Sequence, residues 1–269
     1  MSFARPLTLG ALAVALALGC DTPDDDATPR AGAVEASVES AAPASATAGM
    51  SDAALASAVR ALVPQRTRAG QLRLSSPLVN DPRALPILLE RLRGEQDLSV
   101  ETRAALVEAL PRTGADFGAA AVGLLQTEEA PAVRAVLAAG LRRATPEHAR
   151  AGAALALADA DPEVREAGAR VVGYLDGGEA LADALVAALD DDVEGVRVAA
   201  IRSLGALKVT PAFPRLAALL DDGTPSVRLH ALRALHRIDA AKAQALPGVK
   251  ALARDGDPKV AAAARKLGG

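Results

Sequence analysis

Aromatic residues are almost absent from this chain of 269 residues, which has three Phe, one Tyr and no Trp. A large single core normally relies on the bulk of aromatic rings. Hydrophobic residues nevertheless make up 51% of the chain, and Ala, Leu and Val supply nearly all of them. Because Ala and Leu favour helices and small side chains let helices approach closely, this composition predicts a thin, layered helical core.

Cysteine and histidine are equally scarce. Cys20 is the single cysteine, so no intrachain disulfide and no cysteine-based metal cluster can form. The three histidines are His148, His230 and His236. On a helix His230 and His236 would point about 120° apart, so they could not share a metal ion unaided, and we expect packing or surface roles for them.

Common signatures of catalysis and cofactor binding are also missing. The chain has neither of the glycine-rich phosphate patterns, GxGxxG and GxxxxGK[ST], nor a GxSxG nucleophile turn. Asp159, Asp161 and Glu163 resemble the first ligands of a calcium loop, but Val164 replaces its glycine and Arg170 its bidentate glutamate. The formal net charge of -3 gives no argument for nucleic-acid binding. We therefore predict no metal, no cofactor and no nucleic acid.

The N-terminus has the pattern of a targeting segment. Arg5 precedes an apolar run, Leu7 to Leu18, that is too short to span a bilayer and ends at Gly19-Cys20. This resembles the bacterial lipoprotein signal, in which a small residue precedes a cysteine that is acylated and becomes the mature N-terminus. Ala17 departs from that pattern, where leucine is usual. The resemblance implies lipidation at Cys20, export to the bacterial cell envelope and a membrane anchor made of acyl chains; the alternative is an ordinary cleaved secretory signal.

The pattern predicts four segments along the chain. Residues 1–19 form the signal peptide, and residues 20–50 form a disordered tether rich in Asp, Pro, Ala and Ser. Asp24 to Asp26 are interpreted as solvated linker charge in this tether. Residues 51–80 form an N-terminal helical cap or degenerate repeat, with a helix near Ala53 to Leu62. The repeats described next begin at residue 81.

A short motif recurs along the rest of the chain, with separations of 31, 31, 32, 31 and 33 residues. Its anchor is an apolar residue, or threonine in the first copy: Thr102, Val133, Val164, Val196, Val227 and Val260. Small or apolar residues follow at offsets of 4, 8 and 11, which lie within a narrow arc at about 100° per residue. Each anchor therefore belongs to the buried face of a helix, which we call the second helix of its unit.

Prolines predict where these second helices begin. They stand two residues before four anchors, at Pro131, Pro162, Pro225 and Pro258, and proline suits the first helical turn because its missing N–H would be unpaired there. Asp161, Thr224 and Asp257 precede three of the prolines and could cap the helix.

Other amphipathic stretches lie between the second helices and predict a first helix in each unit: Ala84–Leu92, Phe117–Leu125, Ala149–Leu157, Leu181–Leu189 and Phe213–Leu220. Several end in turns rich in aspartate. No stretch alternates convincingly at a period of two, so we predict no sheet.

These units resemble HEAT-like repeats of the short bacterial type shared with phycobilisome lyase subunits. The motifs D-P-E-V-R at Asp161–Arg165 and T-P-S-V-R at Thr224–Arg228 carry the resemblance. It implies six repeats over residues 81–269 in an all-α, right-handed α-solenoid, with the second helices on a concave, partner-binding surface. The chain lacks the His-Glu dipeptides of HEAT-like di-iron hydroxylases. We expect a non-enzymatic protein-binding scaffold; the alternative is an enzyme or enzyme subunit related to phycobilisome lyases.

Two sets of charged residues remain. The first, which we call the arginine ladder, directly follows five anchors and consists of Arg103, Arg134, Arg165, Arg197 and Arg228. It lies at the margin of the buried arc, near the acidic turns. We expect each guanidinium to tie one repeat's turn to the next by charged hydrogen bonds.

The second set, which we call the basic row, lies six residues after the last four repeat anchors: Arg170, Arg202, Arg233 and Lys266. The equivalent residues in the first two units are Glu108 and Ala139. The row points away from the buried arc, and stacked repeats would align it. It is either a solvated helix face or the docking strip for a protein partner with an acidic segment.

Overall fold

Proline sets the start of the second helices. The structure is a computed structural model that describes residues 46–95 and 97–268. In it, Pro131, Pro162, Pro225 and Pro258 are each the first residue of an α-helix, as predicted. The predicted signal peptide, Cys20 and nearly all of the predicted tether lie outside the described residues.

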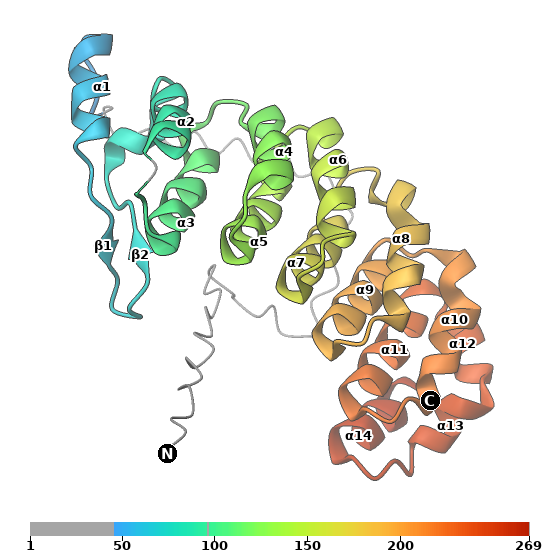
Figure 1. The fold of residues 1–269 in the computed structure, drawn as a ribbon. Coiled ribbons are helices and arrows are strands. Elements are labelled where there is room, and N and C mark those ends of the chain that lie inside the picture. Colours follow the sequence, from blue (N-terminus) through green and yellow to red (C-terminus); the bar gives the residue numbers. More distant parts are fainter. Residues whose placement is uncertain (1–45, 96, 269) are drawn as a thin grey trace, which may run out of the picture. The chain divides into compact units, whose positions relative to one another are not determined.

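The described chain is an all-α solenoid of helical hairpins, which confirms the predicted fold class (Figure 1). The second helices are α3 (Val100–Ala109), α5 (Pro131–Gly140), α7 (Pro162–Val172), α9 (Glu194–Ala206), α11 (Pro225–Ile238) and α14 (Pro258–Leu267). The first helices are α2 (Ala84–Gly94), α4 (Gly118–Thr127), α6 (Pro146–Leu157), α8 (Ala182–Ala187) and α10 (Phe213–Ala218). In the last hairpin the first helix is divided into α12 (Ala240–Ala245) and α13 (Pro247–Leu252).

Short 3₁₀ turns tighten several helix ends and connections: η1 (Pro77–Asn80), η2 (Leu110–Thr113), η3 (Leu141–Arg143), η4 (Gly178–Leu181), η5 (Ala188–Asp190), η6 (Thr210–Ala212) and η7 (Leu219–Asp221). Such turns satisfy carbonyl groups that an α-helix leaves unpaired at its end. The predicted first helices Leu181–Leu189 and Phe213–Leu220 extend past the ends of α8 and α10 because η5 and η7 directly follow these helices.

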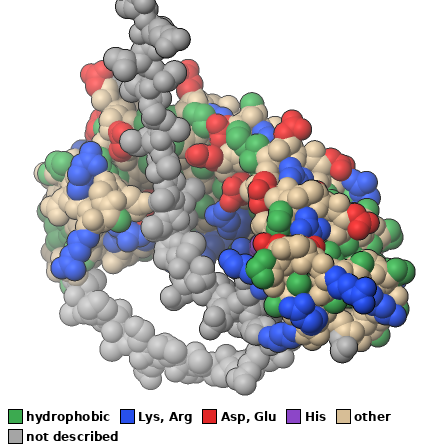
Figure 2. All heavy atoms as spheres, turned by 90° about the horizontal axis from the view of Figure 1, so that it is seen from below, with side chains coloured by type: hydrophobic (Ala, Val, Ile, Leu, Met, Phe, Trp, Pro, Cys, Tyr) green, Lys and Arg blue, Asp and Glu red, His purple; other side chains and the backbone are tan. Residues whose placement is uncertain are grey.

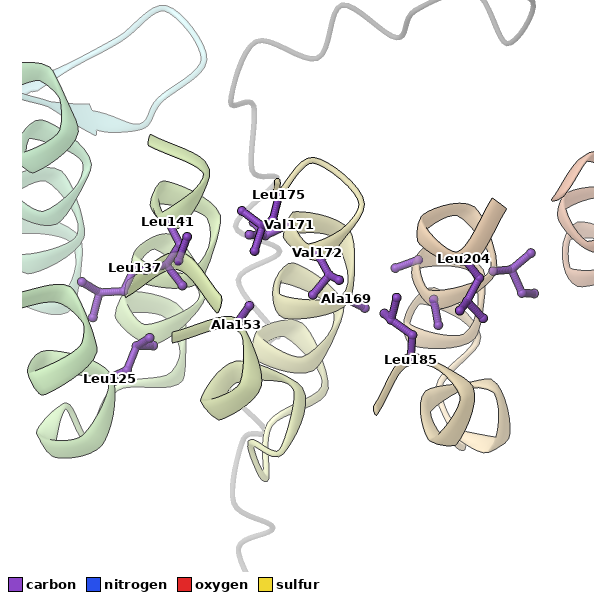
Figure 3. Close-up of a cluster of buried hydrophobic side chains, with 14 of the residues drawn as sticks. Leu125, Leu137, Leu141, Ala153, Ala169, Val171, Val172, Leu175, Leu185 and Leu204 are labelled. Carbon is purple, nitrogen blue, oxygen red and sulfur yellow. The ribbon is translucent and has the colours of Figure 1, made fainter. Parts of the chain in front are cut away.

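Within the unit Ala44–Gly269, the second helices form an inner layer and the first helices an outer layer (Figure 1). Each second helix packs on the next, from α3 through α5, α7, α9 and α11 to α14. Leucine, valine and alanine side chains fill the space between layers, as Figure 3 shows around α5 to α9. The approach of α9 to α11 is close enough that a Cβ on Gly205 would lie 2.8 Å from the Ala234 Cβ. The valine anchors are all buried, and Thr102 is half-buried.

The segment before the hairpins contains a small sheet, so the prediction of no sheet was wrong. After α1 (Asp52–Arg60), strands β1 (Gln65–Arg66) and β2 (Leu72–Arg73) pair antiparallel, Gln65 opposite Arg73. A strand of two residues is too short to show an alternating pattern. The hairpin is specified by its turn, in which Gly70 has a φ of 80°, a conformation that glycine adopts without strain.

Two of the three predicted side-chain caps are present. Asp161 accepts a hydrogen bond from the Glu163 N–H, and Asp257 accepts from Lys259 and Val260. Thr224 occupies the cap position of α11 but makes no side-chain cap hydrogen bond. The Asp222 carboxylate instead accepts from the Thr224 N–H at 2.7 Å, so aspartate orders the turn before the helix. None of the helices in the described residues is both long and apolar enough to cross a membrane.

Candidate functional site

The basic row lies on four successive helices of the inner layer, α7, α9, α11 and α14. Arg170, Arg202 and Lys266 are exposed, and Arg233 is half-buried. Each follows a buried anchor by six residues, which places it on the opposite side of its helix from the core. Lys and Arg side chains gather in the hollow of the face shown in Figure 2.

Arg170 has a carboxylate beside it on its own helix. It forms an ion pair with Glu166, one turn earlier, and its side chain stays 46% exposed. Solvent-exposed pairs of this kind contribute little free energy because water screens both charges. The pair with Glu166 therefore contributes little to stability.

A second line of exposed residues runs beside the basic row, and the sequence reasoning missed it. Arg143, Tyr174 and Arg237 each follow an anchor by ten residues and are exposed. Within α11, Arg237 lies about 40° around the axis from Arg233, so these two residues share one face. Arg143 lies in η3 and Tyr174 in the turn after α7, at the ends of the neighbouring second helices. The repeat register itself was the available signal, extended by one turn beyond the basic row.

Tyr174 is the single tyrosine of the chain and is 64% exposed. Its N–H donates to the Val171 carbonyl at 2.9 Å, which continues the turn past the end of α7. It therefore lies one turn after Arg170. The equivalent residue two units earlier, Arg112, is used internally, because it donates to the Leu74 carbonyl at 2.6 Å and so holds β2's end against η2.

Four members of the arginine ladder form ion pairs with an acidic residue in the next turn. Arg103 pairs with Glu128, Arg134 with Asp159, Arg165 with Asp191 and Arg228 with Asp255. The Arg134, Arg165 and Arg228 pairs use both Nε and Nη2, with distances of 2.7 to 3.1 Å. This fork-to-carboxylate geometry is the strongest form of the charged hydrogen bond.

In four units, the arginine of the helix that follows the acidic turn also donates a hydrogen bond to the backbone of that turn. Nη1 of Arg134, Arg165, Arg197 and Arg228 donates to the carbonyl oxygen of Glu128, Asp159, Asp191 and Asp222, respectively, at 2.7 to 3.0 Å. Three of these acidic residues thus accept from two arginines of successive units, one at the carboxylate and one at the carbonyl. The carboxylate also accepts from a backbone N–H two residues later, as Asp191 does from Val193 at 2.9 Å.

Arg197 is the exception in the ladder. Within the described residues it forms no ion pair, and its Nε is buried without a hydrogen-bond partner. Asp222 stands at the expected place in the next turn, but the guanidinium does not reach its carboxylate. The line of ion pairs is therefore interrupted between α9 and α11, although these two helices pack on each other like their neighbours.

The ladder shifts the ionisation of its members. Hydrogen bonds from Arg134, Arg165 and Arg228 hold the pKa of Asp159, Asp191 and Asp255 below the ordinary aspartate value. The same bonds raise the pKa of the three arginines. Both shifts favour the charged forms, so the paired state is the stable one at neutral pH.

His230 and His236 lie on α11, and His148 lies on α6. His148 Nδ1 lies 2.8 Å from the Thr145 hydroxyl, His230 Nδ1 lies 2.8 Å from the Ser226 carbonyl, and His236 Nδ1 is buried without a hydrogen-bond partner. The described part of the chain has no group of three or more His, Cys, Asp or Glu residues that could hold a metal ion.

Known proteins share this architecture. The family model of HEAT repeats matches residues 151–235 and 182–268, so the chain carries HEAT-like repeats. A designed armadillo repeat protein for modular peptide recognition is similar in structure, with a TM-score of 0.52, 20% identity, and coverage of 68% of this chain and 98% of that one. Another designed armadillo repeat protein, in complex with the peptide (KR)4, has a TM-score of 0.50 and 22% identity, and the match covers 69% of this chain and 99% of that one. No curated protein matches the chain.

Proposed function

We propose that this protein is a non-enzymatic scaffold that binds an acidic segment of a partner protein along the inner layer of its solenoid. The observation that carries the proposal is the basic row, which places one cation on each of four successive second helices. Guanidinium groups bind carboxylates through paired, directional hydrogen bonds. A row of such groups at repeat spacing suits an elongated acidic segment.

The arginine ladder supports this assignment by exclusion. Its guanidinium groups are occupied by turn carboxylates and carbonyls, so we assign them the structural role of joining neighbouring units. In the basic row, by contrast, Arg170, Arg202 and Lys266 are exposed on the inner layer. We therefore assign the arginine ladder to stability and the basic row to binding.

The second designed neighbour gives an instructive contrast in charge. Its complex contains a basic peptide, (KR)4. In this chain the positive charges belong to the protein itself, on its inner layer. Electrostatic complementarity therefore requires a negatively charged ligand. The expected partner segment is acidic.

The binding surface would be held at the bacterial cell envelope by acyl chains on Cys20. The support for this part of the proposal is the apolar run that ends at Gly19-Cys20. Replacing Cys20 with Ser should abolish lipid labelling and release the protein from membranes into the soluble fraction. Unchanged labelling and fractionation of this variant would overturn the anchor.

The binding proposal is tested with a fluorescently labelled poly-glutamate peptide and the purified chain without its signal peptide. Anisotropy should show binding that weakens as salt rises, because exposed charges are screened over about 8 Å at physiological ionic strength. Reversing Arg202 and Arg233 to Glu should weaken binding while circular dichroism stays unchanged. The matched control reverses Lys250 and Arg254, exposed residues of α13 and the turn after it. Equal binding by the wild type and the row variant would contradict the proposal.

A further inference from the structure

The described structure limits the backbone conformation that a bound segment can adopt. We infer that the partner segment is an acidic polyproline II helix with a carboxylate at every third residue, packed against Tyr174. The inference rests on the proposed function and specifies the ligand class for the same surface.

The spacing of the repeats provides the first argument. The basic row supplies one cation for each of α7, α9, α11 and α14, which pack successively on one another. Axes of packed helices are about 8–10 Å apart. A polyproline II helix rises about 3.1 Å per residue with three residues per turn, so every third side chain returns to the same side after about 9 Å. A β-strand fails this match, because residues three apart point to opposite faces.

The backbone of the inner layer provides the second argument. It consists of helices, whose N–H and C=O groups are hydrogen-bonded internally. In the described residues the sheet edges belong to β1 and β2, in the segment before the hairpins. A segment bound along α7 to α14 therefore finds no strand to pair with. Polyproline II suits this surface because its backbone stays solvated and needs no ordered partner.

Tyr174 provides the third argument. It is a 64% exposed aromatic residue that follows Arg170 by four residues, in the turn that continues α7. Aromatic side chains on a groove are the usual contact for the rings of proline-rich segments. An α-helical ligand also repeats its face, every seven residues over about 10.5 Å, but it has no proline rings to place against the tyrosine.

Three synthetic peptides of equal charge separate these possibilities. The first repeats the triplet Glu-Pro-Pro, with one triplet for each member of the basic row. The second has the same composition with its glutamates in one block. The third is a helical peptide with glutamate at every seventh position. Anisotropy with the purified chain lacking its predicted signal peptide should show the triplet peptide binding about fivefold more tightly than the other two, since only it matches both the spacing and the ring contact.

Two variants test the ring contact itself. Tyr174→Ala should weaken binding of the triplet peptide about fivefold and leave the helical peptide, which has no proline, unaffected, while Tyr174→Phe should keep the wild-type affinity. Circular dichroism checks that both variants are folded, which is expected because the side chain is exposed. Equal loss for both peptides would assign Tyr174 a role unrelated to proline and overturn the inference.

The outcomes also separate this inference from the function on which it rests. If all three peptides bind equally and with salt dependence, the acidic partner stands and the polyproline II ligand is wrong. If the helical peptide binds best, the ligand is a helix and the inference is wrong. If none binds, both are wrong.

Discussion

The central units and the last unit of the solenoid are built on one register but differ at two positions. Five residues after the anchor, the earlier second helices carry a buried apolar residue that faces the next unit: Val107, Ala138, Ala169, Ile201 and Leu232. The last helix carries exposed Arg265 there. The ladder arginine is also replaced, by Ala261. In the described residues, the residue at this offset is therefore apolar and buried where a following second helix packs against it, and charged and exposed in α14.

Exchanging residues between the two regions should give the largest effect. Ile201→Arg places a charge between α9 and α11, where no carboxylate is expected to compensate it, and should cost about 3–5 kcal/mol of unfolding free energy. The reciprocal Arg265→Ile should change stability by about 0.5 kcal/mol or less, because its site is exposed. Urea unfolding measures both. Similar costs would mean that the last unit is packed like the central ones.

Truncating the anchors should give an intermediate effect. Val196→Ala in a central unit removes two buried methyl groups and should cost about 1–3 kcal/mol. Val260→Ala should cost less, because α14 packs on one second helix and Val196 lies in a helix with one on each side. Urea unfolding of the two variants, measured in parallel, gives both free energies. Equal losses would contradict the claim that the central unit is packed on more sides than the last one.

The smallest effect should come from acid titration of the ladder. The pKa of Asp191 is lowered in the folded protein, so its contribution is complete above the unfolded-state value of about 4 and is lost as pH falls through the folded value. Asp191→Asn should therefore be less stable than the wild type at neutral pH. The difference should shrink as pH falls below about 4, where the carboxylate of the unfolded chain becomes protonated, and vanish below the lowered pKa of the folded protein. A difference independent of pH would assign the loss to packing.

The sequence predicted those features that repeat. Because the same anchor recurs at nearly constant separation, the second helices, their starting prolines and the buried valines could be placed before the structure. The β1–β2 hairpin could not, since it occurs once and its strands have two residues each. Repetition reveals a period, whereas a single turn with Gly70 gives only a local signal.

The candidate site was predictable to a similar extent. The basic row followed from its offset alone, and the same register gives the position of Tyr174, whereas the exposure of Tyr174 required the structure. The sequence could not predict the interruption of the ladder at Arg197, since Asp222 stands at the expected sequence position for its partner. Whether a guanidinium meets a carboxylate depends on helix separations, which a period in residues does not fix.

Photocrosslinking from the second line of inner-layer residues tests the central claim most directly. Ala206, exposed between Tyr174 and Arg237 in that line, is replaced by a photoreactive phenylalanine analogue, and exposed Ala251 on α13 of the outer layer serves as the matched position. With the labelled Glu-Pro-Pro peptide, we predict a crosslink from position 206 that is lost in the Arg202→Glu, Arg233→Glu variant, and little or none from position 251. Crosslinking from the outer position alone, or insensitivity to the charge reversal, would place the binding surface elsewhere.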